Sequence, residues 1–215
     1  MPLTLKKLLP KYAILPLITV VVWNMAVYFG SRFFSTGLYH YNLTSRFDDM
    51  IPLVPWTVVI YLGCYLFWIV NYILSCQTTK AKVAQFTSAD ILGKTVCLIF
   101  YLCLPTTNIR PEITGTDFFS HLMLWLYQTD AADNLLPSIH CLISWLCFIG
   151  VRKLDHIPRW WKIVSLMIAI LICLSTLTTK QHVIIDVLAG IFLAESCYFI
   201  AQKFTPLKPL VNWIK

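Results

Sequence analysis

The stretch WWKIVSLMIAILICLSTLTTKQHVIIDVLAG, Trp160–Gly190, joins two long apolar runs through a short polar turn. A helix of about 20 apolar residues is needed to cross the hydrocarbon core of a bilayer. The run at 160–178 has that length, and the run that begins at 183 continues to 204. The stretch therefore predicts two membrane-spanning helices, with His182 close to the turn between them.

The composition of the whole chain agrees with this prediction. Of its 215 residues, 58% are hydrophobic and only 13% are charged, which is about half the charged share of globular proteins. We expect an all-α fold, a polytopic bundle of six transmembrane helices that forms a single membrane domain over residues 1–215. The expected spans are 12–30, 52–76, 91–107, 136–152, 160–178 and 183–204.

Basic residues indicate how such a bundle is oriented. The net charge is +7, and its lysines and arginines stand in short clusters between apolar runs, a pattern more typical of membrane orientation than of nucleic-acid binding. Six spans place both termini on one side. Of the 17 basic residues, only Arg32, Arg46, Arg110 and Lys180 then fall on the other side. This asymmetry predicts cytoplasmic termini in a multi-pass protein, which we expect in the plasma membrane.

The N-terminal segment resembles a signal peptide in one respect. Lys6, Lys7 and Lys11 precede its apolar run. No clear small-x-small cleavage site follows, so we expect an uncleaved first span.

Three polar groups collect on the side away from the termini. PTTNIRPE carries Arg110, NLLPSIHC carries His140, and the last group contains His182 and Asp186. Residues four apart share one face of a helix. Asp186 is therefore expected to accept a hydrogen bond from His182, which leaves the other ring nitrogen as a nucleophile or base.

The other members of these groups suit phosphate chemistry. His140 is a candidate proton donor to a leaving group, and the planar guanidinium of Arg110 matches phosphate oxygens. Ser138 follows a proline where a helix is expected to begin, so it and nearby amides are candidates to hold an anion. Thr178 and Gln181 fit a capping box, which predicts His182 in the first turns of the last span.

Each of these polar residues also has a structural explanation. Any one intramembrane histidine or aspartate is as readily explained by a partner inside the bundle, but the convergence of three groups favours a site. A metal site of His140, His182 and Asp186 lacks a dense set of ligands, and an ion pathway would place charges nearer mid-bilayer. Asp48 is expected in a solvated outer loop, with a substrate role as the lesser alternative, and Glu195 is expected to pair inside the bundle.

Arg-Pro, then Pro-Ser-x-His, then His-x-x-x-Asp in a six-span chain resembles the phosphatidic acid phosphatase type 2 (PAP2) superfamily. That superfamily includes lipid phosphate phosphatases, sphingomyelin synthases and inositol phosphorylceramide synthases. The resemblance runs from about 48 to 190, within a family-like core of about 48–204. It implies a phosphohistidine mechanism without metal or cofactor, in which His182 attacks phosphorus, Asp186 orients it, His140 protonates the leaving alkoxide and Arg110 binds phosphate oxygens.

The chain departs from the phosphatase branch at several motif positions. Cys103 stands where that branch has a lysine, the arginine expected near Ser175 and Thr176 is missing, and Ile139 replaces a glycine. Lys180 is a candidate to supply the lost positive charge at a phosphate. The motif spacing, with DDMIPLVPW upstream, is nearer the branch of the inositol phosphorylceramide and sphingomyelin synthases.

The sequence therefore predicts a membrane enzyme that acts on a lipid. The expected reaction is phosphatase or phosphotransferase cleavage of a lipid phosphoester or pyrophosphate at the outer membrane face. One alternative is a headgroup transferase of the two synthase types, and another is a lipid-binding protein or transporter without catalysis. The expected partners are a lipid phosphate or phospholipid and the membrane, with no nucleic acid.

Overall fold

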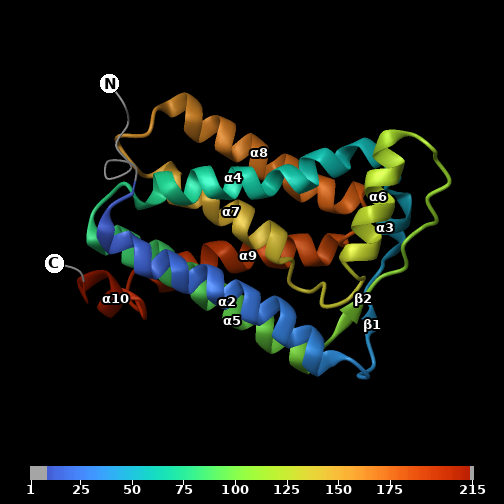
Figure 1. The fold of residues 1–215 in the computed structure, drawn as a ribbon, viewed down its shortest axis with the longest axis horizontal. Coiled ribbons are helices and arrows are strands. Elements are labelled where there is room, and N and C mark those ends of the chain that lie inside the picture. Colours follow the sequence, from blue (N-terminus) through green and yellow to red (C-terminus); the bar gives the residue numbers. More distant parts are fainter. Residues whose placement is uncertain (1–8, 214–215) are drawn as a thin grey trace.

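The computed structural model describes residues 9–213, which form a bundle of long helices with short elements across one end (Figure 1). Lys6 and Lys7, part of the expected uncleaved first span, lie outside the described residues. The elements are α2 (Lys11–Ser35), β1 (Tyr41–Asn42), α3 (Arg46–Met50), the 3-10 helix η1 (Pro55–Thr57), α4 (Val58–Cys76), α5 (Lys80–Cys103), β2 (Thr106–Thr107), α6 (Phe118–Thr129), α7 (Ile139–Arg152), α8 (Arg159–Thr178), α9 (Ile184–Ile200) and α10 (Lys208–Trp213).

Four segments are long and apolar enough to cross a membrane: Lys11–Ser35, Pro55–Cys76, Lys80–Cys103 and Arg159–Thr178. The mainly helical fold is thereby confirmed, and these four helices are candidate membrane spans by length and composition. The other two expected spans correspond to shorter helices, since α7 has 14 residues and α9 has 17. The count of six spans stays a prediction.

The third long helix begins earlier than its hydropathy predicts. The expected span starts at residue 91, whereas α5 starts at Lys80, where the side chain of Thr79 caps the helix. The early turns are polar, but Asp90 and Lys94 are buried and form an ion pair of 2.6 Å one turn apart. Lys94 counted among the basic residues on the side of the termini. The structure places it inside the bundle, where a buried charge needs a partner, and Asp90 provides one.

Helix α7 is the centre of the bundle. It packs against α4, α5, α8 and α9, and in Figure 1 it runs between α4 and α9. Leu142 and Leu146 of α7 have no exposed surface. The short length of α7 is compatible with this position, because neighbouring helices cover it. The start of α7 therefore places the buried Ser138, its N-cap, and the partly buried His140 between neighbouring helices.

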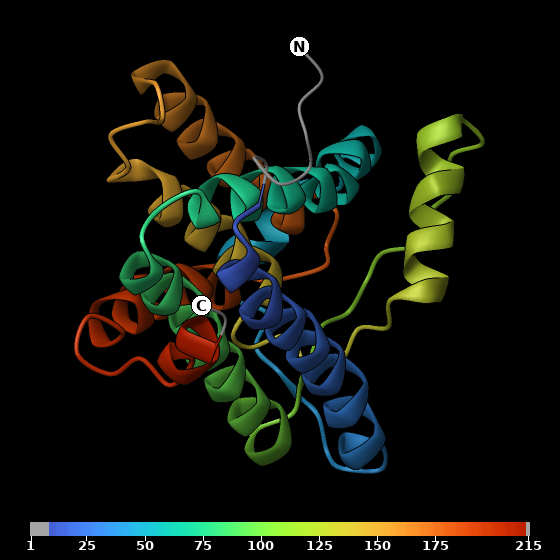
Figure 2. The same ribbon diagram turned by 60° about the vertical axis from the view of Figure 1, so that its left-hand side comes forward.

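The ends of the bundle differ. At one end, the strands β1 and β2 pair in parallel, and α6 lies across the long helices, set apart from them in Figure 2. At the other end, Arg152 makes two contacts with Glu195, at 2.6 and 2.8 Å. Glu195 is paired, as expected, but its side chain is 40% exposed at this end of the bundle and is not enclosed inside it.

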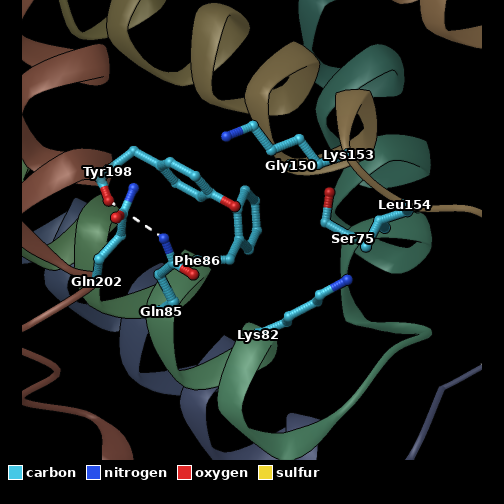
Figure 3. Close-up of a pocket in the computed structure, with 9 residues that line it drawn as sticks. All are labelled: Ser75, Lys82, Gln85, Phe86, Gly150, Lys153, Leu154, Tyr198 and Gln202. Atoms are coloured by element: carbon cyan, nitrogen blue, oxygen red, sulfur yellow. Dashed lines mark hydrogen bonds between the residues drawn. The ribbon is translucent and has the colours of Figure 1, made fainter.

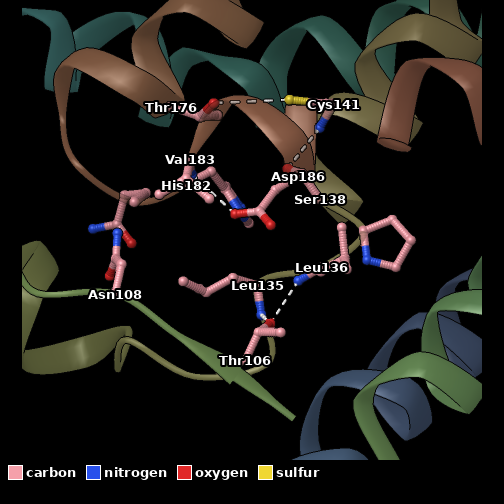
Figure 4. A network of polar contacts seen from close by, with 12 residues as sticks. Thr106, Asn108, Leu135, Leu136, Ser138, Cys141, Thr176, His182, Val183 and Asp186 are labelled. Carbon is pink, nitrogen blue, oxygen red and sulfur yellow. Dashed lines mark hydrogen bonds and ion pairs between the residues drawn. The ribbon is translucent and has the colours of Figure 1, made fainter. Parts of the chain in front are cut away.

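The small sheet also fixes the approach to α7. Thr106 of β2 is buried, and its hydroxyl oxygen accepts hydrogen bonds from the amides of Leu135 and Leu136 at 3.0 and 2.9 Å (Figure 4). These bonds hold the segment that leads to Ser138, so the position of His140 depends on the strand that follows α5.

Candidate active site

A cavity of about 360 Å³ opens at the end of the bundle where α7 and α9 begin. Both histidines of the two motifs line it. Its wall also includes Tyr65, Trp68, Asp130 and Gln181. The structure thus brings the two motif histidines, 42 positions apart in the sequence, into one enclosure.

His182 and Asp186 form the first half of the site. Their Nδ1 and Oδ2 atoms are 3.4 Å apart, a distance within ion-pair range but longer than a normal charged hydrogen bond. Asp186 is fully buried and His182 is 8% exposed. Figure 4 shows the Asp186 carboxylate directed toward the backbone and ring ahead of α9. With Nδ1 facing the carboxylate, Nε2 of His182 is the nitrogen left for chemistry.

The local backbone at His182 differs from the expectation. α9 begins at Ile184, and Asp186 Oδ2 accepts a hydrogen bond from the amide of Val183 at 2.9 Å. The capping box predicted from Thr178 and Gln181 is therefore wrong, because Asp186 itself caps the helix. His182 lies in the loop before α9, and the pair meets across the helix start.

The surroundings of His182 change its protonation. Burial alone lowers the pKa of an imidazole, because it disfavours the charged form. The contact with Asp186 and the negative charge of that carboxylate act in the opposite direction and outweigh burial, so the pKa of His182 is raised above its usual value.

His140 forms the second half of the site, in the first turn of α7. Its ring centroid is 6.1 Å from that of His182. It stacks on Tyr61 with centroids 4.5 Å apart, and its Nε2 is buried without a hydrogen-bond partner among the described residues. Two imidazoles at this separation are close enough to contact the same phosphate group, because each contact spans about 3 Å.

A tyrosine and an aspartate that the sequence analysis did not single out stand behind His140. The hydroxyl of Tyr61 lies 3.4 Å from Nδ1 of His140 and donates to Oδ2 of Asp130 at 3.2 Å. Tyr28 donates to the other oxygen of Asp130 at 2.8 Å. Asp130 comes from the loop after α6 and Tyr61 from α4, so no local spacing in the sequence links them to His140.

Arg110 reaches the site through another side chain. Its guanidinium donates to the carbonyl oxygen of Asp130 at 2.5 Å and to Oε1 of Gln181 at 2.6 Å, and it lies over the ring of Tyr127. Burial lowers the pKa of Arg110, but the group remains a cation. Arg110 is not among the described residues that line the cavity, whereas Gln181 is. Nε2 of Gln181 is buried and has no partner in the described chain.

Ser138 links the two halves. Its hydroxyl oxygen caps α7 by accepting from the amide of Cys141 at 3.3 Å, and its own amide donates to the carbonyl oxygen of Asp186 at 3.1 Å. Gly190 allows this approach, since a Cβ there would lie 2.6 Å from the carbonyl oxygen of Ser138. The polar groups of Ser138 named here are engaged within the protein and join the starts of α7 and α9.

Lys180 faces away from the histidines. It adopts a left-handed backbone with φ of 55°, and its ammonium donates to the carbonyl oxygens of Asp48 and Ile51 at 2.8 and 2.5 Å. Lys180 does not line the cavity among the described residues. This geometry indicates a tie between the His182 loop and α3 in place of the phosphate contact expected for Lys180.

Asp48 also differs from its expectation. It is only 6% exposed, whereas it was expected in a solvated loop. Its Oδ1 accepts from the amide of Ile184 at 2.7 Å, and its Oδ2 accepts from the amide and hydroxyl of Ser45. Burial acts to raise the pKa of Asp48, but these hydrogen bonds and the charge of Lys180 lower it overall. Asp48 therefore fixes the loop that carries His182.

Comparison with protein families identifies one match. The family described as the PAP2 superfamily matches residues 35–200, a range that contains both histidines, Asp186, Arg110 and Asp48. Comparison with curated proteins finds no match.

Proposed function

Because the chain belongs to the PAP2 superfamily, we propose that it is a lipid phosphatase or phosphotransferase of the membrane that works through a phosphohistidine on His182. One observation carries the proposal: the rings of His182, which is buried, and His140, which is partly buried, lie 6.1 Å apart in a single cavity, and His182 is backed by a carboxylate. A nucleophile with an orienting partner and a second acid or base is the arrangement that covalent group transfer requires.

In the first step, Nε2 of neutral His182 attacks phosphorus and the bond to the leaving oxygen breaks. Nε2 of protonated His140 gives its proton to that oxygen, so the lipid alcohol leaves neutral. Asp186 accepts from Nδ1 of His182 and stabilises the positive charge that develops on the ring. The products of this step are phosphohistidine and a neutral His140.

In the second step, water or an acceptor hydroxyl attacks the phosphohistidine. His140, now neutral, takes the proton of the attacking hydroxyl, and the bond between phosphorus and His182 breaks. The site returns to its starting protonation. Tyr61 and Asp130 support His140 in both states, because their hydrogen-bonded chain ends at its Nδ1.

The phosphate oxygens need donors. We assign one to Nε2 of Gln181, which lines the cavity and has no protein partner among the described residues. Arg110 holds Oε1 of the same amide at 2.6 Å, so it orients the amide and adds positive charge nearby. Ser138 contributes by holding the starts of α7 and α9 together.

A lipid substrate fits the apolar part of the cavity wall. Met25 and Phe29 of α2, both exposed on the surface of the described bundle, also line the cavity beside Leu62 and Trp125. Acyl chains in the bilayer can therefore stay in contact with α2 while the phosphate reaches the histidines.

The excess of basic residues on the side of the termini supports a cytoplasmic location for the termini and an extracytoplasmic location for the active site.

Hydrolysis and transfer use the same first step, and the acceptor decides between them. The test is phosphate release by the full-length protein in detergent, with and without EDTA, from phosphatidic acid and an isoprenyl pyrophosphate. Release that survives EDTA and disappears in His182→Ala supports a phosphohistidine phosphatase. Product that forms only after a diacylglycerol or ceramide acceptor is added supports headgroup transfer. Binding of lipid phosphate without any turnover would contradict both.

A further inference from the structure

The helix bounds place a second cavity, of about 440 Å³, at the opposite end of the bundle from His182. Figure 3 shows its lining residues. The cavity is formed where α4, α7 and α9 end and α5 begins. Each helix contributes to the lining: α4 through Ser75, α5 through Lys82, the end of α7 through Lys153 just after it, and α9 through Tyr198. Because all these helix ends meet at one end of the bundle, the cavity lies at the depth where lipid headgroups would be found.

The charge of this cavity has one sign. Lys82 extends from the first turn of α5 and Lys153 from the end of α7, and Figure 3 shows both side chains bordering the same space. The nine described residues that line the cavity include no carboxylate. Glu195, one turn before Tyr198, pairs with Arg152 and also interacts electrostatically with Lys153. No carboxylate of the lining itself neutralises either lysine.

Uncharged polar groups complete the lining. The side-chain amide of Gln85 donates to the carbonyl oxygen of Tyr198 at 3.3 Å, which fixes that amide at the wall. The hydroxyl of Ser75 is buried without a partner in the described chain, and a Cβ at Gly150 would lie 2.2 Å from it. Because Gly150 has no side chain, the Ser75 hydroxyl has room at the floor of the cavity.

The mouth of the cavity adjoins surface that suits lipid chains. Phe199, next to the lining residue Tyr198, is 68% exposed, and Phe204, two residues beyond the lining residue Gln202, is 58% exposed. Basic pockets between transmembrane helices bind anionic headgroups, with exposed apolar surface beside them for the chains. We propose that this basic end cavity binds the phosphate of an anionic membrane lipid, with Lys82 and Lys153 as its cationic ligands.

The test is lipid binding by the purified full-length protein, measured by native mass spectrometry with short-chain phosphatidylglycerol. Replacing both lysines, Lys82→Gln with Lys153→Gln, should weaken binding by about thirtyfold. Each lysine near a headgroup contributes about fivefold to the affinity for an anionic lipid, and the two contributions multiply. A matched control, Lys162→Gln with Lys208→Gln, removes the same charge at the same end but outside the cavity and should bind like the unmodified protein. A second pair, Lys82→Arg with Lys153→Arg, keeps the charge and should keep binding.

Several results would overturn the proposal. Equal binding by the glutamine pair and the control would show that the lysines are not ligands, and loss of binding in the arginine pair would show a structural effect. Equal binding of phosphatidylcholine would remove the requirement for an anionic headgroup. Displacement by glycerol phosphate at the concentration at which the lipid binds would identify a soluble ligand. The proposal is independent of catalysis, and the glutamine pair should retain turnover.

Discussion

The two histidines of the active-site cavity are held in different ways. His182 lies on a loop whose neighbours are tied by polar contacts, from Asp48 to Ile184 and from Lys180 to α3. His140 lies on a helix and is enclosed by rings, with the centroids of Tyr61 and Trp68 at 4.5 and 5.5 Å. The His182 ring is placed by its polar loop and by the Asp186 carboxylate 3.4 Å away, and the His140 ring mainly by aromatic packing.

This difference matches the roles that we propose. A nucleophile needs one nitrogen aimed at phosphorus, and directional contacts from Asp186 and the loop provide that aim. A general acid needs a protected position near the leaving oxygen, which the aromatic enclosure provides. Substitutions that remove a polar contact should therefore disturb the position of His182 more than that of His140. Four predictions test this comparison.

The largest effect is expected from His182→Ala. Removal of the nucleophile should lower kcat on the order of 10⁵-fold, because no covalent intermediate can form. The measurement is phosphate release, with thermal unfolding in detergent as the control for folding. A folded variant with full activity would disprove the phosphohistidine.

His140→Gln should lower turnover of a lipid phosphate by about 10³-fold, since the leaving alkoxide loses its proton donor. An aryl phosphate with an acidic leaving group needs no such donor, so much of the loss should disappear with that substrate. His182→Ala should show no such recovery. Equal behaviour of both variants with both substrates would remove the proposed division of roles.

Asp186→Asn should lower turnover by about 10²-fold and change its pH dependence. His182 attacks only when neutral, and its pKa is raised by Asp186 against the effect of burial. Activity is therefore lost as pH falls through this raised pKa. Without the negative charge the pKa falls, so the acidic limb of the kcat profile should move to lower pH. An unchanged limb would show that Asp186 does not control His182.

Asp48→Asn should have the smallest effect, a loss of about tenfold in kcat, because a slightly displaced nucleophile reacts more slowly. The lowered pKa of Asp48 means that its contribution to stability is present above the unfolded-state pKa and is lost as pH falls through the folded-state pKa. The variant should therefore lose thermal stability at neutral pH and less at acidic pH. The exposed neighbour offers a control, Asp49→Asn, which should change neither property.

Local patterns in the sequence predicted the helical class well. Hydropathy located a helix at each of the six expected spans, because burial in lipid demands long apolar runs. It failed for the first half of α5, because the residues from Lys80 to Asp90 are largely polar, and Asp90 forms a buried pair with Lys94 near the middle of the helix. A hydropathy average treats each charge as exposed, whereas this pair is neutralised within the helix and further bonded by Tyr72.

By itself, the sequence determined the membrane class, the motif histidines and the family resemblance, since composition and short spacings are local properties. Only the tertiary structure decided which polar residues serve those histidines. Asp48 meets Ile184 across 136 positions, and Tyr61 meets Asp130 across 69. The same structure turned Lys180 toward α3 and placed Gln181 at the cavity. Such contacts depend on how separate helix ends meet, and no spacing along the chain encodes that meeting directly.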